Sequence, residues 1–272
     1  MFEPYDDAGF VDPDAFDEPS YSTYDLATQG PEPVPPWVVT DGAAIDHDRG
    51  VLKTGKEADV HLVERAVPGG RHCLLAAKRY RTAEHRLFHR DAGYLEGRRV
   101  RRSRETRAMA RRTDFGRDLL AGQWAAAEFT ALSRLWAAGA PVPYPVQLAG
   151  TELMLEFVGT PDGQAAPRLA QLRPPPGELA DLFEQCVRAM QLLAGQGWAH
   201  GDLSAYNVLV HRGRVVLIDL PQVVDLAANP QGADYLHRDC RNIYRWFVRR
   251  GLTTVEFDHL YGDLMAEAVG AW

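Results

Sequence analysis

The stretch from His200 to Asp219 constrains the fold of this chain more than any other. It reads His-Gly-Asp-Leu-Ser-Ala-Tyr-Asn, followed by two β-branched runs on either side of Arg212-Gly213. Because glycine accepts a positive φ at that point, we predict a tight β-hairpin over Val208–Ile218. With a two-residue turn, Asn207 falls opposite the residue before Asp219. The hairpin therefore brings Asn207 and Asp219 together.

An amide oxygen and a carboxylate at neighbouring strand ends are hard ligands suited to Mg²⁺ rather than zinc. Asp202 lies five residues before Asn207. This spacing, with a second aspartate closing the next strand, is typical of the catalytic loop and metal-binding aspartate of phosphotransferases. We therefore predict that Asp202 orients or deprotonates an acceptor hydroxyl, while Asn207 and Asp219 hold the metal. The alternative is an ordinary hairpin whose polar residues only cap turns.

The composition is that of a soluble globular protein, with 46% hydrophobic and 25% charged residues in 272. No apolar run approaches the ~20 residues that span a bilayer, and the first residues are acidic where a signal peptide would be basic. We therefore expect a cytoplasmic protein that makes no membrane contact. The three cysteines, Cys73, Cys186 and Cys240, are far apart and suggest neither disulfides nor a metal site.

Two segments have unusual charge. Residues 1–36 contain Asp and Glu but no Lys or Arg and are rich in proline, which predicts a disordered acidic tail. This tail either engages a basic partner or serves as a solubilising extension. The stretch 81–117 contains twelve arginines, which favours a flexible insert that contacts ribosomal RNA or a ribonucleoprotein. A solvated basic helix, folded onto the acidic tail, is the alternative.

A second set of polar residues lies on predicted strands and a helix. From Val51 the chain reads as strand, turn and strand, and the third strand, His72–Tyr80, places Lys78 on one face with Leu74 and Ala76. A lysine at that position suits pairing with phosphates. The following helix, from Asp118 to Gly139, carries Glu128 in an otherwise apolar stripe, so we expect Lys78 to neutralise it. A strand-end Lys or a helix-edge Glu that reaches solvent is the alternative.

The glycine loop of the first turn is a weak signal by itself. It contains Gly55 followed directly by Lys56, and so it is not a Walker A loop. If it covers phosphates, it does so with Gly55, Lys56 and backbone N–H groups. After Gly159 the chain becomes polar and rich in proline, which predicts the boundary between two lobes. We therefore expect a tail over 1–36, an N-lobe over 37–158 and a C-lobe over 159–272.

Together these motifs resemble the RIO family of atypical protein kinases, most closely its type-one branch. The similarity covers about Val51 to Gly251. The residues that carry it are Gly55–Val60, Lys78, Glu128, His200–Asn207, Ile218–Asp219, Gln222–Asp225 and Tyr235–Ile243. The resemblance implies an α+β, protein-kinase-like fold with a small β-rich N-lobe and a mainly helical C-lobe. It also implies ATP and Mg²⁺ as cofactors.

The resemblance further implies roles for individual residues. Lys78 would contact the α- and β-phosphates and pair with Glu128. Asp202 would be the catalytic proton acceptor, and Asn207 and Asp219 would bind the metal, with Asp219 also a candidate phosphate acceptor. The resemblance also places Gly55, Lys56 and Val60 at the nucleotide. It places the backbone of Glu156 and Val158 at the adenine.

Three functions compete at this point. The leading one is a serine/threonine kinase of RIO type that acts mainly through autophosphorylation or ATP hydrolysis, because Leu220-Pro221 follows Asp219 and no peptide-binding activation segment is visible. A small-molecule phosphotransferase of the aminoglycoside or choline kinase type shares His-Gly-Asp, but Gly55–Val60 fits it poorly. A nucleotide-binding scaffold without turnover is the third, and the intact Lys78 and Asp202 count against it.

Overall fold

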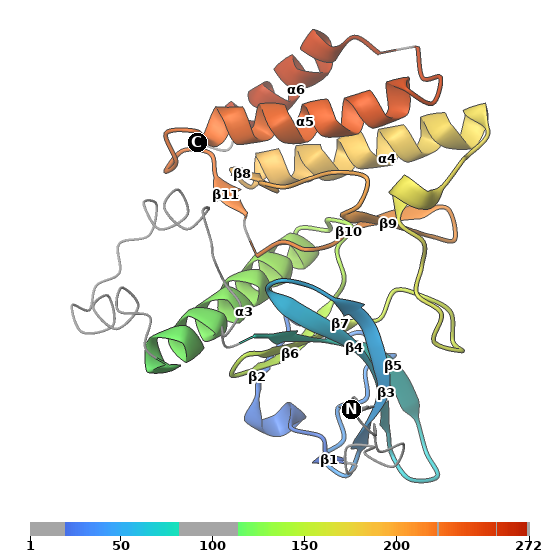
Figure 1. Cartoon of the computed structure of the whole chain (residues 1–272), viewed down its shortest axis with the longest axis vertical. Coiled ribbons are helices and arrows are strands. Elements are labelled where there is room, and N and C mark those ends of the chain that lie inside the picture. Colours follow the sequence, from blue (N-terminus) through green and yellow to red (C-terminus); the bar gives the residue numbers. More distant parts are fainter. Residues whose placement is uncertain (1–19, 82–113, 222, 254, 271–272) are drawn as a thin grey trace, which may run out of the picture.

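The computed structural model describes residues 20–81, 114–221, 223–253 and 255–270, without the side chains of residues 114–119. Figure 1 shows a curled sheet crossed by a long helix, and beyond it a layer of further helices. This is the two-lobed α+β, protein-kinase-like arrangement that the sequence predicts. In these ranges, no helix combines the length and the apolar character needed to cross a bilayer.

The N-lobe is a seven-stranded sheet in which every neighbouring pair is antiparallel. Its spatial order is β1-β3-β4-β5-β7-β6-β2. The strands are β1 (Ser20–Tyr21), β2 (Thr28–Gln29), β3 (Ile45–Thr54), β4 (Ala58–Ala66), β5 (His72–Tyr80), β6 (Pro145–Ala149) and β7 (Glu152–Glu156). β5 lies at the centre of this sheet, so both of its edges are paired.

The two-residue period of β5 separates its two faces, as the sequence predicts. Leu75 and Ala77 are buried in the core of the N-lobe. Ala76 and Lys78 lie on the opposite face, where they line the cleft between the lobes. Strand β5 therefore places Lys78 in the cleft, while Leu75 and Ala77 on its other face pack in the core.

Helix α3 (Asp114–Ala137) connects the two lobes. It begins four residues before the expected start at Asp118. Trp124 packs in a small cluster with Tyr80 of the sheet, whereas Leu132 and Leu135 belong to the main core of the C-lobe. Glu128 lies between these two contacts, at the level of the cleft.

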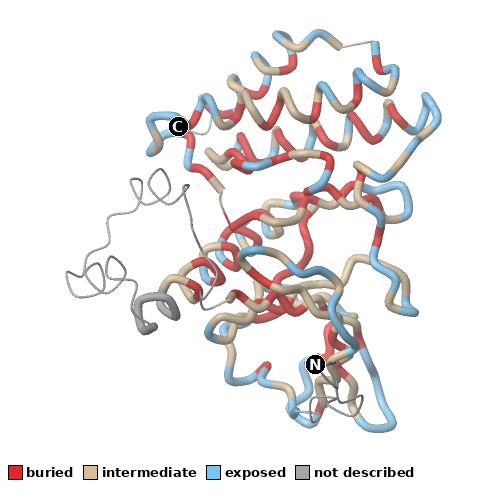
Figure 2. Tube along the Cα trace, viewed as in Figure 1, coloured by how far each residue is buried: buried red, intermediate tan, exposed pale blue. Residues whose placement is uncertain are grey.

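The C-lobe contains three helices, which Figure 1 shows packed side by side. They are α4 (Pro176–Gly195), α5 (Gly232–Val248) and α6 (Phe257–Gly270). The lobe also holds short 3₁₀ and strand segments, namely η2 (Leu169–Gln171), β8 (Trp198–Ala199), β9 (Val208–His211), β10 (Arg214–Leu217) and β11 (Val224–Asp225). Figure 2 shows buried residues along the sides where these helices meet, with exposed residues on their outer faces.

The predicted hairpin is confirmed with its register. His211 pairs with Arg214 and Leu209 pairs with Val216. The turn residues Arg212 and Gly213 have φ of 50° and 73°, so both positions are left-handed, as a type I′ turn requires. The N–H of Ile218 donates to the carbonyl of Asn207 at 3.0 Å, which extends the pairing to the residue before Asp219.

The end of the expected tail differs from the prediction. Residues 20–36 are folded against the N-lobe, because β1 and β2 pair with the two edges of its sheet. The N–H of Gly30 donates to the carbonyl of Val146 at 3.1 Å, and Tyr24 is buried. The segment is held by backbone hydrogen bonds at the sheet edges and by the buried ring of Tyr24. Neither kind of contact produces a periodic pattern of hydrophobic residues in the sequence.

The other predictions about charged segments concern residues that the structure does not describe. The acidic residues 1–19 lie outside the described ranges. So does most of the arginine-rich stretch 81–117, of which residues 82–113 are not described. The last four positions of that stretch form the first turn of α3. The predicted contact with ribosomal RNA therefore stays a prediction.

Candidate active site

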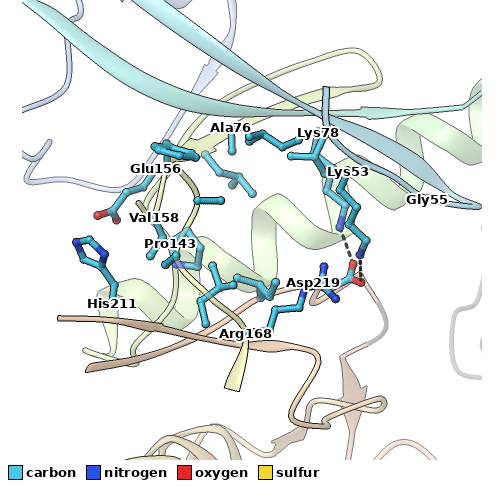
Figure 3. A pocket seen from close by; sticks show the side chains of 18 of the residues that line it. Lys53, Gly55, Ala76, Lys78, Pro143, Glu156, Val158, Arg168, His211 and Asp219 are labelled. Atoms are coloured by element: carbon cyan, nitrogen blue, oxygen red, sulfur yellow. Dashed lines mark hydrogen bonds and ion pairs between the residues drawn. The ribbon is translucent and has the colours of Figure 1, made fainter. Parts of the chain in front are cut away.

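A cleft of about 1060 Å³ lies between the two lobes. Figure 3 shows that side chains from both lobes point into it. Lys53 and Lys78 come from the strands above, and Arg168 and Asp219 lie on the opposite wall. Most of the residues predicted from the sequence line this cleft, which are Gly55, Lys56, Val60, Lys78, Glu128, Glu156, Val158, Asp202 and Asp219.

The ammonium group of Lys78 lies between two carboxylates. Its Nζ is 2.9 Å from Oε1 and 2.8 Å from Oε2 of Glu128, so the expected pair is present. The same Nζ donates to Oδ1 of Asp219 at 2.8 Å. Lys53 lies further away, with Nζ 4.0 Å from Oδ2 of Asp219. A strand of the N-lobe and the end of the C-lobe hairpin therefore meet through one buried cation.

These contacts set the charges of the group. Burial by itself would lower the pKa of Lys78, but the carboxylates of Glu128 and Asp219 outweigh it, and the pKa of Lys78 is raised. For Asp219, burial would raise the pKa, but Lys78 outweighs it and lowers the pKa to about 2. Both side chains are therefore charged at neutral pH, and the strong electrostatic pairing compensates for their burial.

Glu128 is held by more than its partner lysine. Its side chain is 1% exposed, so an unsatisfied carboxylate oxygen would be costly. Oε2 accepts the hydroxyl of Tyr80, and Oε1 accepts the backbone N–H of Leu220 at 3.0 Å. Burial and the neighbouring Glu128 carboxylate raise the pKa of Tyr80 well above its usual value, so this hydroxyl stays a donor.

The loop that carries Asp202 is fixed from behind by a buried aspartate. Asp239 of α5 accepts the N–H of Gly201 at 2.8 Å and the N–H of Leu203 at 2.9 Å, one on each carboxylate oxygen. Burial raises the pKa of Asp239 despite these two donors. Because the residues on both sides of Asp202 are held, the loop presents the exposed Asp202 side chain from a fixed backbone.

Asn207 and Asp219 fit a hard cation that carries its own oxygen ligands. The amide Nδ2 of Asn207 donates to the carbonyl of Asp202 at 2.9 Å, which leaves its oxygen as the group suited to a metal. Asp219 is ionised and has a φ of 68°, a left-handed conformation that is uncommon outside glycine. The described residues contain no cluster of three His, Cys, Asp or Glu side chains, so nucleotide oxygens would have to complete such a site.

Gly55 occupies a position in the N-lobe loop that needs glycine. Its N–H donates to the carbonyl of Ala58 at 3.0 Å, and a Cβ at this position would lie 2.8 Å from that same oxygen. The tight turn from Gly55 to Ala58 therefore has no room for a side chain at this position.

At the far end of the cleft, Glu156 N–H donates to the carbonyl of Tyr144 at 2.8 Å. The carbonyl of Val158 accepts the N–H of Ala166 at 2.9 Å. These two backbone groups are therefore already engaged. An adenine would have to use the opposite group of each residue.

Several residues around the cleft were not identified from the sequence. Tyr80 donates to Glu128, and Asp239 accepts hydrogen bonds from the loop that carries Asp202. Both side chains are buried. Lys53 and Arg168 place two more positive charges at the cleft. The tyrosine and the aspartate give no spacing signal, because their partners are distant in the chain.

Comparisons with known proteins identify the family of the chain. Residues 73–260 match the RIO domain family. The chain is 36% identical over 225 residues to the RIO-type serine/threonine-protein kinase Rio1 of Haloferax volcanii, which covers 82% of this chain and 70% of that protein. It is 32% identical over 231 residues to the serine/threonine-protein kinase rio1 of Schizosaccharomyces pombe, covering 84% of this chain but 43% of the yeast protein.

A third relative, the serine/threonine-protein kinase RIO3 of Mus musculus, is 38% identical over 131 residues. That similarity covers 48% of this chain and 25% of the mouse protein. The chain therefore spans less than half of the length of its yeast and mouse relatives.

Proposed function

The chain belongs to the RIO family of serine/threonine protein kinases, and we propose that it uses ATP and Mg²⁺ to phosphorylate serine or threonine hydroxyl groups, including its own. One observation carries this proposal. The ammonium of Lys78 is shared between Glu128 and Asp219 in a cleft large enough for a nucleotide. A lysine held in this way has a fixed position from which its charge can contact phosphates. Fixed, correctly placed charges account for most of the catalysis of phosphoryl transfer.

In this proposal the N-lobe holds the nucleotide. Gly55 and Lys56 cover the phosphates from the loop between β3 and β4, and Val60 of β4 lines the same part of the cleft. The adenine receives the N–H of Val158 and gives a hydrogen bond to the carbonyl of Glu156, because the opposite backbone groups are engaged within the protein. The lobe boundary then falls after Val158, where the chain leaves β7.

The C-lobe supplies the chemistry. Asp202 accepts the proton of the attacking hydroxyl and orients it toward the γ-phosphate. The side-chain oxygens of Asn207 and Asp219 would hold Mg²⁺, and the metal would neutralise the charge that develops on the phosphate oxygens. Asp239 acts through the loop backbone and is a positioning residue. ATP hydrolysis follows the same route when water takes the place of the hydroxyl.

The proposal extends to partners and location. We place the protein in the cytoplasm, without membrane contact. We also keep ribosomal RNA or a ribonucleoprotein as the partner of residues 81–117, because twelve arginines can neutralise phosphates.

The experiment measures ATP hydrolysis and autophosphorylation of the purified chain with and without Mg²⁺. The Asp202→Asn variant and a panel of small alcohols as acceptors complete the set. We expect label on serine or threonine, dependence on Mg²⁺ and loss of the serine and threonine label in Asp202→Asn. Transfer to a small alcohol in preference to protein would instead favour a small-molecule kinase. Nucleotide binding without turnover would favour a scaffold.

A further inference from the structure

The outer side of α5 carries a stripe of positive charge that the proposed chemistry does not use. The buried side of this helix faces the core through Leu236, Cys240, Ile243 and Phe247. The i, i+3, i+7 and i+11 positions on the opposite side are all arginine. We call them the arginine stripe, and its members are Arg238, Arg241, Arg245 and Arg249.

Within the described residues the arginine stripe forms no close ion pair, although Arg238 is attracted to the nearby buried Asp239. None of the ion pairs found there involves one of its members. From Tyr235 to Arg250 the only acidic residue is Asp239, which is buried and bound to the catalytic loop. Arg245 and Arg249 are exposed. Four arginines without an ion pair among the described residues contrast with a net charge of −7 for the whole chain.

The arginine stripe begins at the catalytic loop. The guanidinium of Arg238 donates to the carbonyl of Gly201, the residue before Asp202. One turn later, the side chain of Asn242 donates to the carbonyl of Leu203 at 3.0 Å. A polypeptide whose hydroxyl reaches the exposed Asp202 therefore has the outer face of α5 directly beside it.

The surroundings favour carboxylates over nucleic-acid bases. The guanidinium of Arg250 covers the ring of Trp246, with the Arg carbon 3.7 Å from the ring centroid. Arg238 approaches the ring of Tyr235 in the same way, at 4.8 Å. These aromatic rings are already engaged, so they are poor platforms for stacked bases. Guanidinium groups, in contrast, bind carboxylates through two parallel hydrogen bonds.

The spacing also suits an extended acidic segment. Arg241, Arg245 and Arg249 follow one another at four-residue steps, which in a helix is a rise of about 6 Å per step. In an extended chain, side chains on the same face repeat about every 6.6 Å. A strand-like segment with acidic residues at alternate positions therefore meets successive arginines.

We infer that the arginine stripe is the docking surface for acidic residues that flank the target serine or threonine in a protein substrate. This inference rests on the proposed kinase function and names its substrate class. The substrate would place its hydroxyl at Asp202 and extend its acidic flank along α5. Such a surface would supply the recognition that an activation segment supplies in other protein kinases.

Two labelled peptides test this directly. Both contain one central serine, which is flanked on each side by four glutamates in one peptide and four glutamines in the other. Fluorescence anisotropy without ATP measures their binding to the whole chain. We expect the glutamate peptide to bind at least ~10-fold more tightly, which corresponds to about 1.4 kcal/mol and is within reach of a few exposed charge pairs.

Variants then locate the binding. Arg245→Glu/Arg249→Glu should weaken binding of the glutamate peptide by ~10-fold or more, whereas Arg245→Lys/Arg249→Lys should retain most of it. Arg188→Glu, an exposed arginine of α4, is the control outside the stripe and should leave binding unchanged. ATP turnover without peptide should be the same in all of them, because Arg245 and Arg249 are exposed and lie outside the cleft.

The outcomes separate this inference from the proposed function. Equal binding of both peptides, or unchanged binding in the double glutamate variant, would overturn the docking surface. So would tighter, stripe-dependent binding of a 12-nucleotide RNA, which would make the face a nucleic-acid interface. Stripe-dependent peptide binding without any phosphate transfer would count against the kinase proposal and leave the docking surface standing.

Discussion

The backbone N–H of Leu220 donates a 3.0 Å hydrogen bond to Oε1 of Glu128. The same carboxylate holds the ammonium of Lys78, and Lys78 in turn contacts Asp219, the residue before Leu220. Helix α3, strand β5 and the end of the hairpin are therefore tied by a closed ring of contacts. A shift of α3 relative to the C-lobe would break the bond to Leu220 as well as the ion pair. The position of Asp219, the proposed metal ligand, is thus linked to the position of Lys78, the proposed phosphate-binding residue.

Lys78 and Glu128 should behave as one unit. Removing Lys78 leaves the buried Glu128 carboxylate without its cation, and removing Glu128 leaves Lys78 with Asp219 as its carboxylate partner. Breaking a buried pair typically costs about 3–5 kcal/mol, so the double alanine variant should lose less stability than the sum of the single variants. Urea unfolding and ATP affinity of Lys78→Ala, Glu128→Ala and the double variant provide the cycle. The exposed pair of Arg188 and Glu184 is the control and should be close to additive. Additive losses at Lys78 and Glu128 would show that the two do not act together.

Asp219→Asn should reduce turnover far more than nucleotide affinity. The amide keeps the shape of the side chain but removes the negative charge that Mg²⁺ needs, while the contacts of the N-lobe with ATP remain. We expect kcat to fall at least ~100-fold, which is about 2.7 kcal/mol in the barrier, and the Kd for ATP to change less than ~10-fold. Turnover and equilibrium binding are measured over a Mg²⁺ titration. Asp258→Asn, on the surface of α6, is the matched control. Wild-type turnover in Asp219→Asn would refute the metal assignment.

Asp239→Asn should affect catalysis through the position of the loop. An asparagine has one oxygen where the aspartate uses two, so either Gly201 or Leu203 loses its acceptor. We expect kcat to fall on the order of 10–100-fold, with little change in the KM for ATP, because the nucleotide-binding groups are untouched. The exposed Asp234, on the same helix, serves as the control through Asp234→Asn. A rise in KM that equals the fall in kcat would indicate a general loss of structure instead.

The ion pair of Lys78 and Asp219 should be insensitive to pH across the neutral range. The pKa of Asp219 is lowered from 3.8 to about 2, so its contribution to stability is complete above the unfolded value and is lost as pH falls through about 2. The pKa of Lys78 is raised from 10.5, so its contribution is complete below that value and is lost only as pH rises through the raised pKa. The difference in unfolding free energy between wild type and Asp219→Asn should therefore be constant from about pH 5 to 9. A step in that difference near pH 6 or 7 would contradict these assignments.

The roles of Asp202 and Asp219 should be distinguishable by the type of phosphate bond in the labelled product. If a carboxylate oxygen of Asp219 attacks the γ-phosphorus and ADP leaves, the product is an acyl phosphate. Hydroxylamine cleaves an acyl phosphate but does not cleave phosphoserine. Asp202→Asn removes the base for the water that resolves this species, an effect commonly worth ~10²–10⁴-fold, so label should accumulate on Asp219.

The measurement uses γ-labelled ATP, with half of the sample treated with hydroxylamine and the label then mapped. Complete survival of the label, located on a serine such as Ser22 or Ser103, would mean that Asp219 is a metal ligand only. The protein would then be an autophosphorylating serine kinase without a phosphoaspartate.

The sequence determined the local geometry of the C-lobe site. The register of the hairpin follows from two β-branched runs and a glycine turn, so the approach of Asn207 to Asp219 could be predicted from nearby residues alone. The face of Lys78 on β5 followed from the two-residue period, and the pairing with Glu128 followed from the cost of a lone buried carboxylate. The first two inferences depend on short-range rules that a few neighbouring residues satisfy by themselves. The third joins residues 50 positions apart and depends instead on the cost of burying a lone charge.

Only the tertiary structure decided how the distant parts are held together. The contacts of Tyr80 and Leu220 with Glu128, and those of Asp239 with the loop, join residues separated by 36 to 92 positions. The folding of residues 20–36 onto the sheet edges is of the same kind, because backbone hydrogen bonds carry no side-chain pattern. A hydrogen bond depends on the position of both partners in space, and spacing along a chain predicts that position only within one hairpin, one helix or one strand.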